Sequence, residues 1–222
     1  MSWTQTPIHV IDFEGTRRSG VVEFGVVTVS GGRILQTRTE LCAPTGEMSP
    51  EEERLHGIRK LDTAGRPPLR GHAEYFLRLR RGGVLAAHHA SVEAGLIGGA
   101  IPSPGYAPDW ARPGEEVAGW GPWVDTRALY AQLYPDLDTH KLGGLVAVFR
   151  LAEPLKTLAA MHCPPGRRRA HCALYDALAS ALLLIRLGQD EPEVAGRSLP
   201  WLIQASAPSA SAREDMRQGE LF

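Results

Sequence analysis

The chain has 222 residues, which is enough for one α/β domain with a full hydrophobic core or for two small ones. Hydrophobic residues make up 43% and charged residues 22%, ordinary values for a globular protein, and no apolar stretch is long enough to cross a membrane. The net charge of −1 excludes a constitutive polyanion binder, so a nucleic-acid partner would need local basic patches or bound metal. Three cysteines without a CxxC motif and the lack of a visible secretory signal favour a cytoplasmic location.

The first part of the chain predicts an antiparallel meander. Three strands are expected, at residues 8–16, 21–29 and 34–41. The first is an apolar, β-branched run, and the third alternates apolar and polar side chains. Gly31 and Gly32 provide the hairpin turn between the second strand and the third. A sheet that begins in this way needs further elements to cover it.

The rest of the chain alternates helices with short strands, which predicts parallel additions to the sheet. Strands are expected at residues 84–88 and 123–126, and helices at residues 49–56, 69–81, 90–97, 127–134, 141–149, 155–162, 170–187 and 198–204. Residues 98–122 are rich in Gly, Pro and Trp and predict a long loop. From residue 205 the composition changes to Ala, Ser and Pro, so we expect one domain over residues 1–204 and a disordered tail over 205–222.

Two acids stand near the end of the first strand. Asp12 and Glu14 are two residues apart, and side chains at this spacing lie on the same face of a strand. Two adjacent buried carboxylates repel each other, and a cation between them would relieve the repulsion. Hard oxygen ligands suit Mg²⁺ or Mn²⁺. The alternative is a strand that runs out into a polar loop where both acids are solvated.

Two later stretches combine histidines with acids. Residues 87–93 pass from the end of a strand into a helix that carries Glu93 in its first turns. Residues 171–176 begin the longest apolar helix, where Asp176 is a charged residue among small and apolar neighbours. An acid in that place either faces solvent or meets a partner.

Together the three stretches resemble, in order, the motifs of the DnaQ-like, DEDDh-type 3′–5′ exonucleases of the ribonuclease H-like superfamily. The resemblance covers about residues 7 to 188, and His56-Gly57-Ile58 and Val124-Asp125-Thr126 are supporting matches. It implies an α/β fold with a central five-stranded mixed sheet, an antiparallel meander plus two parallel strands, flanked by helices. The middle motif departs from the family pattern, since His89 replaces Asn, Val92 replaces an aromatic residue and Glu93 replaces Asp. Glu93 keeps the charge but is one methylene longer, which affects the expected metal geometry.

The resemblance implies phosphodiester hydrolysis with two divalent ions, Mg²⁺ or Mn²⁺, acting on the 3′ end of a nucleic acid. The implied metal ligands and catalytic acids are Asp12, Glu14, Glu93 and Asp176. His171 would be the general base, because imidazole is suited to proton transfer near neutral pH. A solvated histidine at the start of a helix is the alternative for His171.

Substrate contacts follow from the same resemblance. It places Gly15 and Thr16 at the terminal nucleotide through their backbone, and His56 and Ile58 in the wall of its pocket. Two further assignments have equally plausible structural alternatives. Phe13 would stack near the terminal base or belong to the core, and His88 would touch a phosphate or be satisfied inside the protein.

Other features bear on partners. Arg167-Arg168-Arg169 suits backbone phosphates, with a solvated loop as the alternative. The last five residues, with Gln218, Leu221 and Phe222, are similar to the bacterial sliding-clamp-binding pentapeptide. DNA is the expected substrate. RNA 3′-end trimming and a catalytically weak module that binds nucleic-acid ends and is tethered to the clamp are the alternatives.

Overall fold

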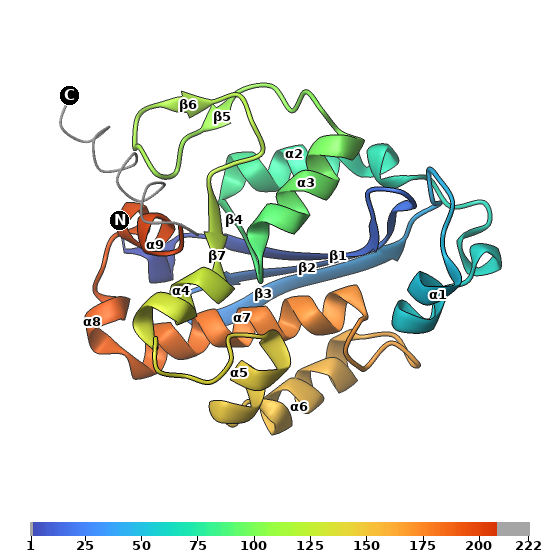
Figure 1. The fold of residues 1–222 in the computed structure, drawn as a ribbon. Helices are drawn as coiled ribbons and strands as arrows, with labels where there is room; N and C mark the ends of the chain where they lie inside the picture. The colour runs from blue at the N-terminus through green and yellow to red at the C-terminus, as the bar shows by residue number, and fades with distance from the viewer. Residues whose placement is uncertain (1, 208–222) are drawn as a thin grey trace.

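The computed structural model describes residues 2–207, and a five-stranded mixed sheet lies at its centre in the order β3-β2-β1-β4-β7 (Figure 1). The strands are β1 Ile8–Thr16, β2 Gly20–Ser30, β3 Arg33–Leu41, β4 Val84–Ala87 and β7 Trp123–Asp125. β1, β2 and β3 pair antiparallel, whereas β4 joins β1 and β7 joins β4 in parallel. The predicted sheet, a meander extended by two parallel strands, is confirmed.

Helices pack around this sheet. They are α1 Pro50–His56, α2 Ala73–Gly82, α3 Ala90–Ala100, α4 Thr126–Leu133, α5 Leu142–Val148, α6 Ala152–His162, α7 Ala173–Asp190, α8 Pro192–Ala195 and α9 Leu199–Ala205, with short 3₁₀ turns η1 Trp3–Gln5, η2 Lys60–Thr63 and η3 Leu69–His72. The helix predicted over 69–81 begins as η3, because two prolines precede it and Gly71 lies within it. Within residues 2–207, no helix combines the length and apolar character that a membrane span requires.

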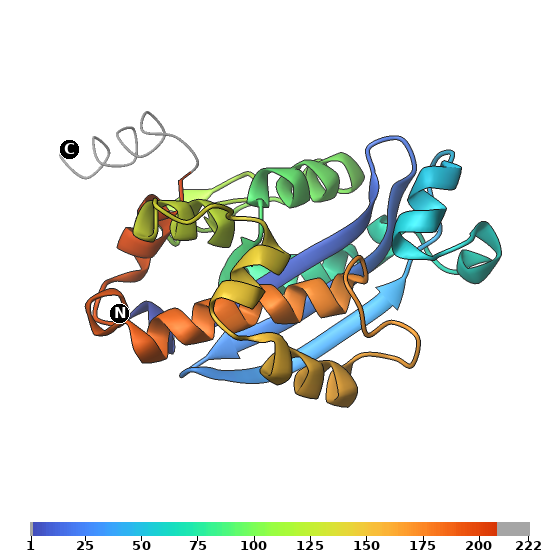
Figure 2. The same ribbon diagram turned by 60° about the horizontal axis from the view of Figure 1, so that its bottom comes forward.

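Alternate residues of β1 divide between two hydrophobic cores. Ile8 and Val10 face the core that α7 covers, together with α5, α6 and α9. Ile11 and Phe13 face the opposite core, beneath α2 and α3. Figure 2 shows α7 running along the sheet, and its apolar residues are buried against β1 and β2. The carboxyl end of β1 is therefore enclosed from both faces.

The loop predicted over 98–122 is only partly correct. α3 continues to Ala100, and β5 Ala107–Pro108 pairs with β6 Glu116–Val117 in a small second sheet. The guanidinium of Arg80, 2% exposed, donates hydrogen bonds to the carbonyls of Gly105 and Val117. Hydrogen bonds from a buried cation to these backbone carbonyls give the segment order that hydrophobic periodicity cannot reveal.

The two ends of the described chain meet. The indole N–H of Trp3 donates to the carbonyl of Val194 at 2.7 Å, and Ser2 forms an isolated bridge with Ser198. Ala205, Ser206 and Ala207 are buried, so packing continues past residue 204, where the composition changes. The clamp-like residues Gln218, Leu221 and Phe222 lie outside the described residues.

Candidate active site

The acid pair of β1 lies on the face of the sheet that α7 covers. Asp12 and Glu14 continue the row that Ile8 and Val10 begin, because residues two apart share a face. Glu14 is 7% exposed and Asp12 is half-buried. The strand thus delivers two carboxylates into a region that water reaches poorly.

A glycine brings α7 onto this face. Gly25 of β2 pairs with Asp12, and a Cβ added to Gly25 would lie 2.3 Å from backbone atoms of Ala173 and Leu174. Because Gly25 has no side chain, the first turn of α7 lies directly on the strand. Asp176, in that first turn, consequently reaches the β1 acids.

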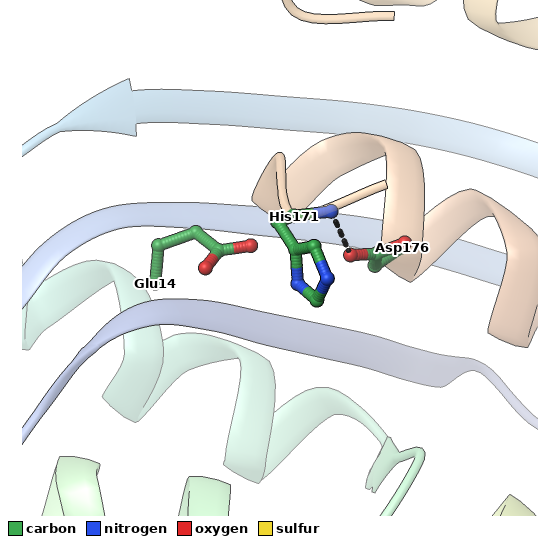
Figure 3. A group of neighbouring side chains, drawn as sticks. All are labelled: Glu14, His171 and Asp176. Atoms are coloured by element: carbon green, nitrogen blue, oxygen red, sulfur yellow. Dashed lines mark hydrogen bonds between the residues drawn. The ribbon is translucent and has the colours of Figure 1, made fainter. Parts of the chain in front are cut away.

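Three side chains are close enough to share one ion (Figure 3). One ligand atom each from Glu14, His171 and Asp176 lies within 4.8 Å of the others. The backbone N–H of His171 donates to the Asp176 carboxylate at 2.8 Å, and Figure 3 shows the imidazole ring between the two acids. His171 has φ +60°, an uncommon conformation for a residue with a side chain, which directs the exposed ring over the acids.

Glu93 enters from the opposite face. It is 5% exposed, and its carboxylate accepts the backbone N–H of Phe13 at 3.1 Å. β4 pairs with β1 only as far as the Val10–Ala86 pair, so the N–H of Phe13 lies beyond the paired strand. The Glu93 carboxylate therefore takes the place of a strand partner for this N–H. Because Phe13 directly follows Asp12, the hydrogen bond brings the Glu93 carboxylate close to the backbone next to Asp12.

The acids raise one another's pKa. Burial comes first among the causes, and it raises the pKa of Glu14 and of Glu93 to about 8 and that of Asp176 to about 6. Burial, followed by the charges of Glu93, Asp176, Glu14 and Glu23, holds the pKa of Asp12 well above its ordinary value. Ionised together, these carboxylates repel, and divalent cations bound between them would remove the repulsion. Their oxygen donors fit hard ions such as Mg²⁺ or Mn²⁺.

Glu23 and Arg167 form a buried ion pair that supports the cluster and that the sequence analysis missed. Glu23 is 3% exposed and pairs in register with Glu14. Arg167 donates from Nε to one Glu23 oxygen at 3.0 Å and from a second nitrogen to the other. The same carboxylate accepts the N–H of Ala173 at 2.8 Å, so it also caps α7. A lone acid in the apolar run of β2 is the signal that points to Glu23.

Asp125 holds the start of α3 in place. Its carboxylate accepts backbone N–H groups of His89 and Ala90 and also those of Arg127 and Ala128 in the first turn of α4. One buried carboxylate therefore caps two helices that meet at the end of β7. The position of Glu93, one turn into α3, depends on this cap.

The residues after the acids on β1 shape the turn beside the site. A Cβ on Gly15, whose φ is +124°, would lie 2.2 Å from the carbonyl oxygen of Gly20, so only glycine fits there. Thr16 closes the turn with Ser19 through side-chain and backbone hydrogen bonds. Of the two alternatives for Phe13, the core is favoured over stacking on a base, because its ring is 6% exposed and packs 5.7 Å from Phe76.

His56 and Ile58 lie at the end of α1 and are both buried. Nδ1 of His56 accepts the N–H of Ile58 at 3.0 Å, and the carbonyl of His56 accepts a hydrogen bond from Arg167. This places α1 against the loop before His171. Their predicted role in a nucleotide pocket stays a prediction.

His88 is satisfied within the protein. Its Nδ1 lies 2.9 Å from the hydroxyl of Thr126, and its Nε2 lies 3.0 Å from the carbonyl of His140. Burial lowers the pKa of His88 to about 4, so the ring is neutral at physiological pH. The structural alternative for His88 is favoured over a phosphate contact.

The three arginines before His171 each make hydrogen bonds within the protein, although Arg168 and Arg169 are exposed. Arg167 pairs with Glu23, Arg168 donates to the carbonyl of Cys163, and Arg169 donates to the carbonyls of Leu55 and Ala170. The three guanidinium groups hold the loop against α1 and α6. They thereby fix the approach of His171 to the acids.

Comparisons with known proteins place the fold. No family model and no curated protein matches the sequence. Among solved structures, Exonuclease X in complex with 5′ overhanging duplex DNA superposes with a TM-score of 0.63 at 23% identity, over 90% of this chain and 99% of that one. The nuclease domain of 3′hExo, described as a DEDDh family member bound to rAMP, gives 0.58 at 18% identity, over 87% and 96%.

E. coli Exonuclease I in complex with a dT13 oligonucleotide gives a TM-score of 0.59 at 13% identity, over 86% of this chain and 43% of that one. The chain thus has the ribonuclease H-like fold of these DEDDh exonucleases, as its motif order predicts. The acids lie at the carboxyl end of the central strand of this fold.

Proposed function

We propose that the protein is a metal-dependent 3′–5′ exonuclease that hydrolyses phosphodiester bonds from the 3′ end of DNA and releases nucleoside monophosphates. The observation that carries this proposal is the convergence of acids from β1, α3 and α7 beside His171. Within residues 2–207, Arg167 and Arg169 lower the pKa of Glu14, but burial and the neighbouring acids outweigh them. The exonuclease fold supports the same conclusion.

Each residue has a role in the proposed reaction. Asp12, Glu14, Glu93 and Asp176 would hold two divalent ions, Mg²⁺ or Mn²⁺, which would supply positive charge against the charge that develops on the scissile phosphate. His171 takes a proton from the attacking water, since its exposed ring faces the acids. Arg167 and Glu23 act as positioning residues, because they fix the loop that carries His171 and the first turn of α7.

A time course on 3′-labelled and 5′-labelled oligonucleotides tests the proposal. Purified protein should shorten a single-stranded DNA stepwise from its 3′ end with Mg²⁺ or Mn²⁺, and EDTA should stop the reaction. Asp12→Asn and His171→Ala should each lower kcat by at least about a hundredfold, because each removes a group from the reacting centre. Cleavage by Asp12→Asn at the wild-type rate would refute the metal site.

RNA is the alternative substrate, since one neighbour is described as a 3′-exonuclease that recognises a histone mRNA stem-loop. The same time course on an RNA of matching sequence distinguishes DNA from RNA as the preferred substrate. A kcat/KM that is lower for DNA than for RNA would make RNA the substrate. A protein that binds 3′ ends of either polymer but cleaves neither would be the catalytically weak module.

A further inference from the structure

A cavity of about 570 Å³ lies between the β1–β2 turn, η3 and α3. This volume falls in the range of roughly 300–1,000 Å³ that is usual for small-ligand sites. Thr16 and Gly95 lie in its wall, two residues beyond Glu14 and Glu93 respectively. The strand and the helix that carry Glu14 and Glu93 thus both continue into the wall of this cavity.

The wall of the cavity is positively charged. Arg17 and Arg70 line it, and none of its lining residues in the described chain is acidic. Neither guanidinium has a hydrogen bond or an ion pair within residues 2–207, and both side chains are exposed. Their charges are therefore not neutralised by this part of the protein.

Nearby arginines differ in this respect. Arg18, next in the same turn, pairs with Glu47, and Arg54 of α1 pairs with Glu51 at 2.8 Å. Of these four arginines, Arg18 and Arg54 have acidic partners, whereas Arg17 and Arg70, which line the cavity, have none within residues 2–207. This charge pattern is complementary to a phosphate group.

The α3 side of the cavity is open because it is built from small residues. A Cβ on Gly95 would lie 3.3 Å from a terminal nitrogen of Arg17, so the guanidinium rests against bare helix backbone. Gly99 and Ala100 continue this surface, and Leu69 and Leu96 add apolar area. A sugar or base can lie on such a surface while its phosphate meets the arginines.

We propose that this cavity binds a nucleotide of the substrate adjacent to the one that is hydrolysed, with its phosphate held between Arg17 and Arg70. The inference rests on the proposed function and adds the place where the polymer is gripped beyond the reacting end. The phosphate can belong to the cleaved strand or to the strand paired with it. The kinetics on single-stranded and on duplex DNA, described below, distinguish these two sources.

The first measurement is the salt dependence of binding, by fluorescence anisotropy of a labelled oligonucleotide in EDTA, where no cleavage occurs. The variant carries Arg17→Ala and Arg70→Ala, and the control carries Arg18→Ala and Arg54→Ala. Both double variants lose two positive charges, so any effect of net charge alone is the same in the variant and in the control. For single-stranded DNA, the slope of log K against log salt should fall by about 0.7 in the variant, the value for one phosphate contact, and stay unchanged in the control.

The second measurement is the kinetics on single-stranded DNA and on duplex DNA with a 5′ overhang. The Arg17→Ala, Arg70→Ala variant should raise KM about tenfold, with kcat within about twofold of wild type, since phosphate contacts of this kind position the substrate. A rise on both substrates assigns the phosphate to the cleaved strand, and a rise on the duplex alone assigns it to the paired strand.

Unchanged KM on both substrates together with an unchanged salt slope, in a variant with the wild-type melting temperature, would overturn the inference. An equal loss in the control would do the same, because the effect would then belong to net charge. Failure of the proposed function is distinct, since the wild-type protein would then cleave no oligonucleotide with any cation.

Discussion

At the scale of single residues, the length of Glu93 fits the structure. Its carboxylate spans from α3 to the backbone of β1 and accepts the N–H of Phe13 at 3.1 Å. An aspartate at the same position would end one methylene short of this N–H. The glutamate in the middle motif is therefore matched to the distance between the helix and the strand.

We expect Glu93→Asp to lower kcat by about a hundredfold, because a shift of roughly 1 Å in a positioned group costs about that much. Glu93→Gln, which keeps the length and the acceptor but loses the charge, should weaken the binding of Mn²⁺, measured by isothermal titration. Steady-state kinetics on single-stranded DNA is the readout for the first variant. Equal or higher kcat in Glu93→Asp would mean that the helix adapts and that reach does not matter.

Residue types and their spacing predict acids that the fold brings together, but they do not predict the residues that support these acids. Asp12, Glu14, Glu93 and Asp176 stand in three local motifs, and each motif is readable without knowing the others. The Glu23–Arg167 pair joins residues 144 positions apart in the chain, so no local pattern announces it. Phe13 shows that sharing a motif does not mean sharing a site. A residue between two acids on a strand points to the opposite face of the sheet.

At the scale of elements, the position of α7 on the sheet decides whether the site forms. The helix rests on β2 at Gly25 and is capped there by Glu23. Local sequence predicts this helix from its apolar face and predicts the strand from its β-branched residues. Local sequence does not predict how closely α7 approaches β2. That distance depends on the missing side chain of Gly25 in β2 and on the backbone of the first turn of α7.

Gly25→Ala should displace the first turn of α7, since the new Cβ would lie 2.3 Å from backbone atoms that have little freedom to move. We expect kcat to fall about a hundredfold through the misplacement of Asp176. Circular dichroism should show that the fold persists, while thermal unfolding should shift to lower temperature.

Gly82→Ala is the matched control, because nothing lies within 4 Å of a Cβ at that position and its φ is not positive. It should keep the wild-type kcat and should raise stability slightly, by about 0.5–1 kcal/mol, since alanine restricts the unfolded chain. A wild-type kcat in Gly25→Ala would show that α7 does not depend on this close contact.

The segment 98–122 marks another limit at this scale. Its Gly-rich and Pro-rich composition predicts a loop, and most of it lacks regular structure. The order it does have comes from Arg80 in α2, and from the indole N–H of Trp120, which donates to the carbonyl of Ile101 at 2.7 Å. Such contacts have no periodic signature in the sequence.

At the scale of the whole molecule, the acid cluster makes stability depend on pH. The folded protein raises the pKa of Glu14 and of Glu93 to about 8 from an ordinary value of 4.5, so between these values it binds more protons than the unfolded chain. The stability of the metal-free protein must then fall as pH rises through this window. In the proposed function, metal ions bound to the deprotonated acids would counteract this loss.

We therefore expect the melting temperature in EDTA to fall between about pH 6 and pH 8.5, and the gain from Mn²⁺ to be larger at the higher pH. Differential scanning fluorimetry at both pH values provides the measurement. In Glu14→Gln the fall in EDTA should be smaller, because one of the titrating groups is gone. A gain from Mn²⁺ that is equal at both pH values would contradict the coupling of the ion to these acids.

The contact between Trp3 and Val194 has a consequence for synthesis on the ribosome. The first and last described segments pack into one core, and Asp176 lies late in the chain. An unfinished polypeptide can neither close that core nor assemble the full set of carboxylates. Both steps must therefore wait until α7 and α9 have been synthesised, since these two helices supply Asp176 and the segment that packs near Trp3.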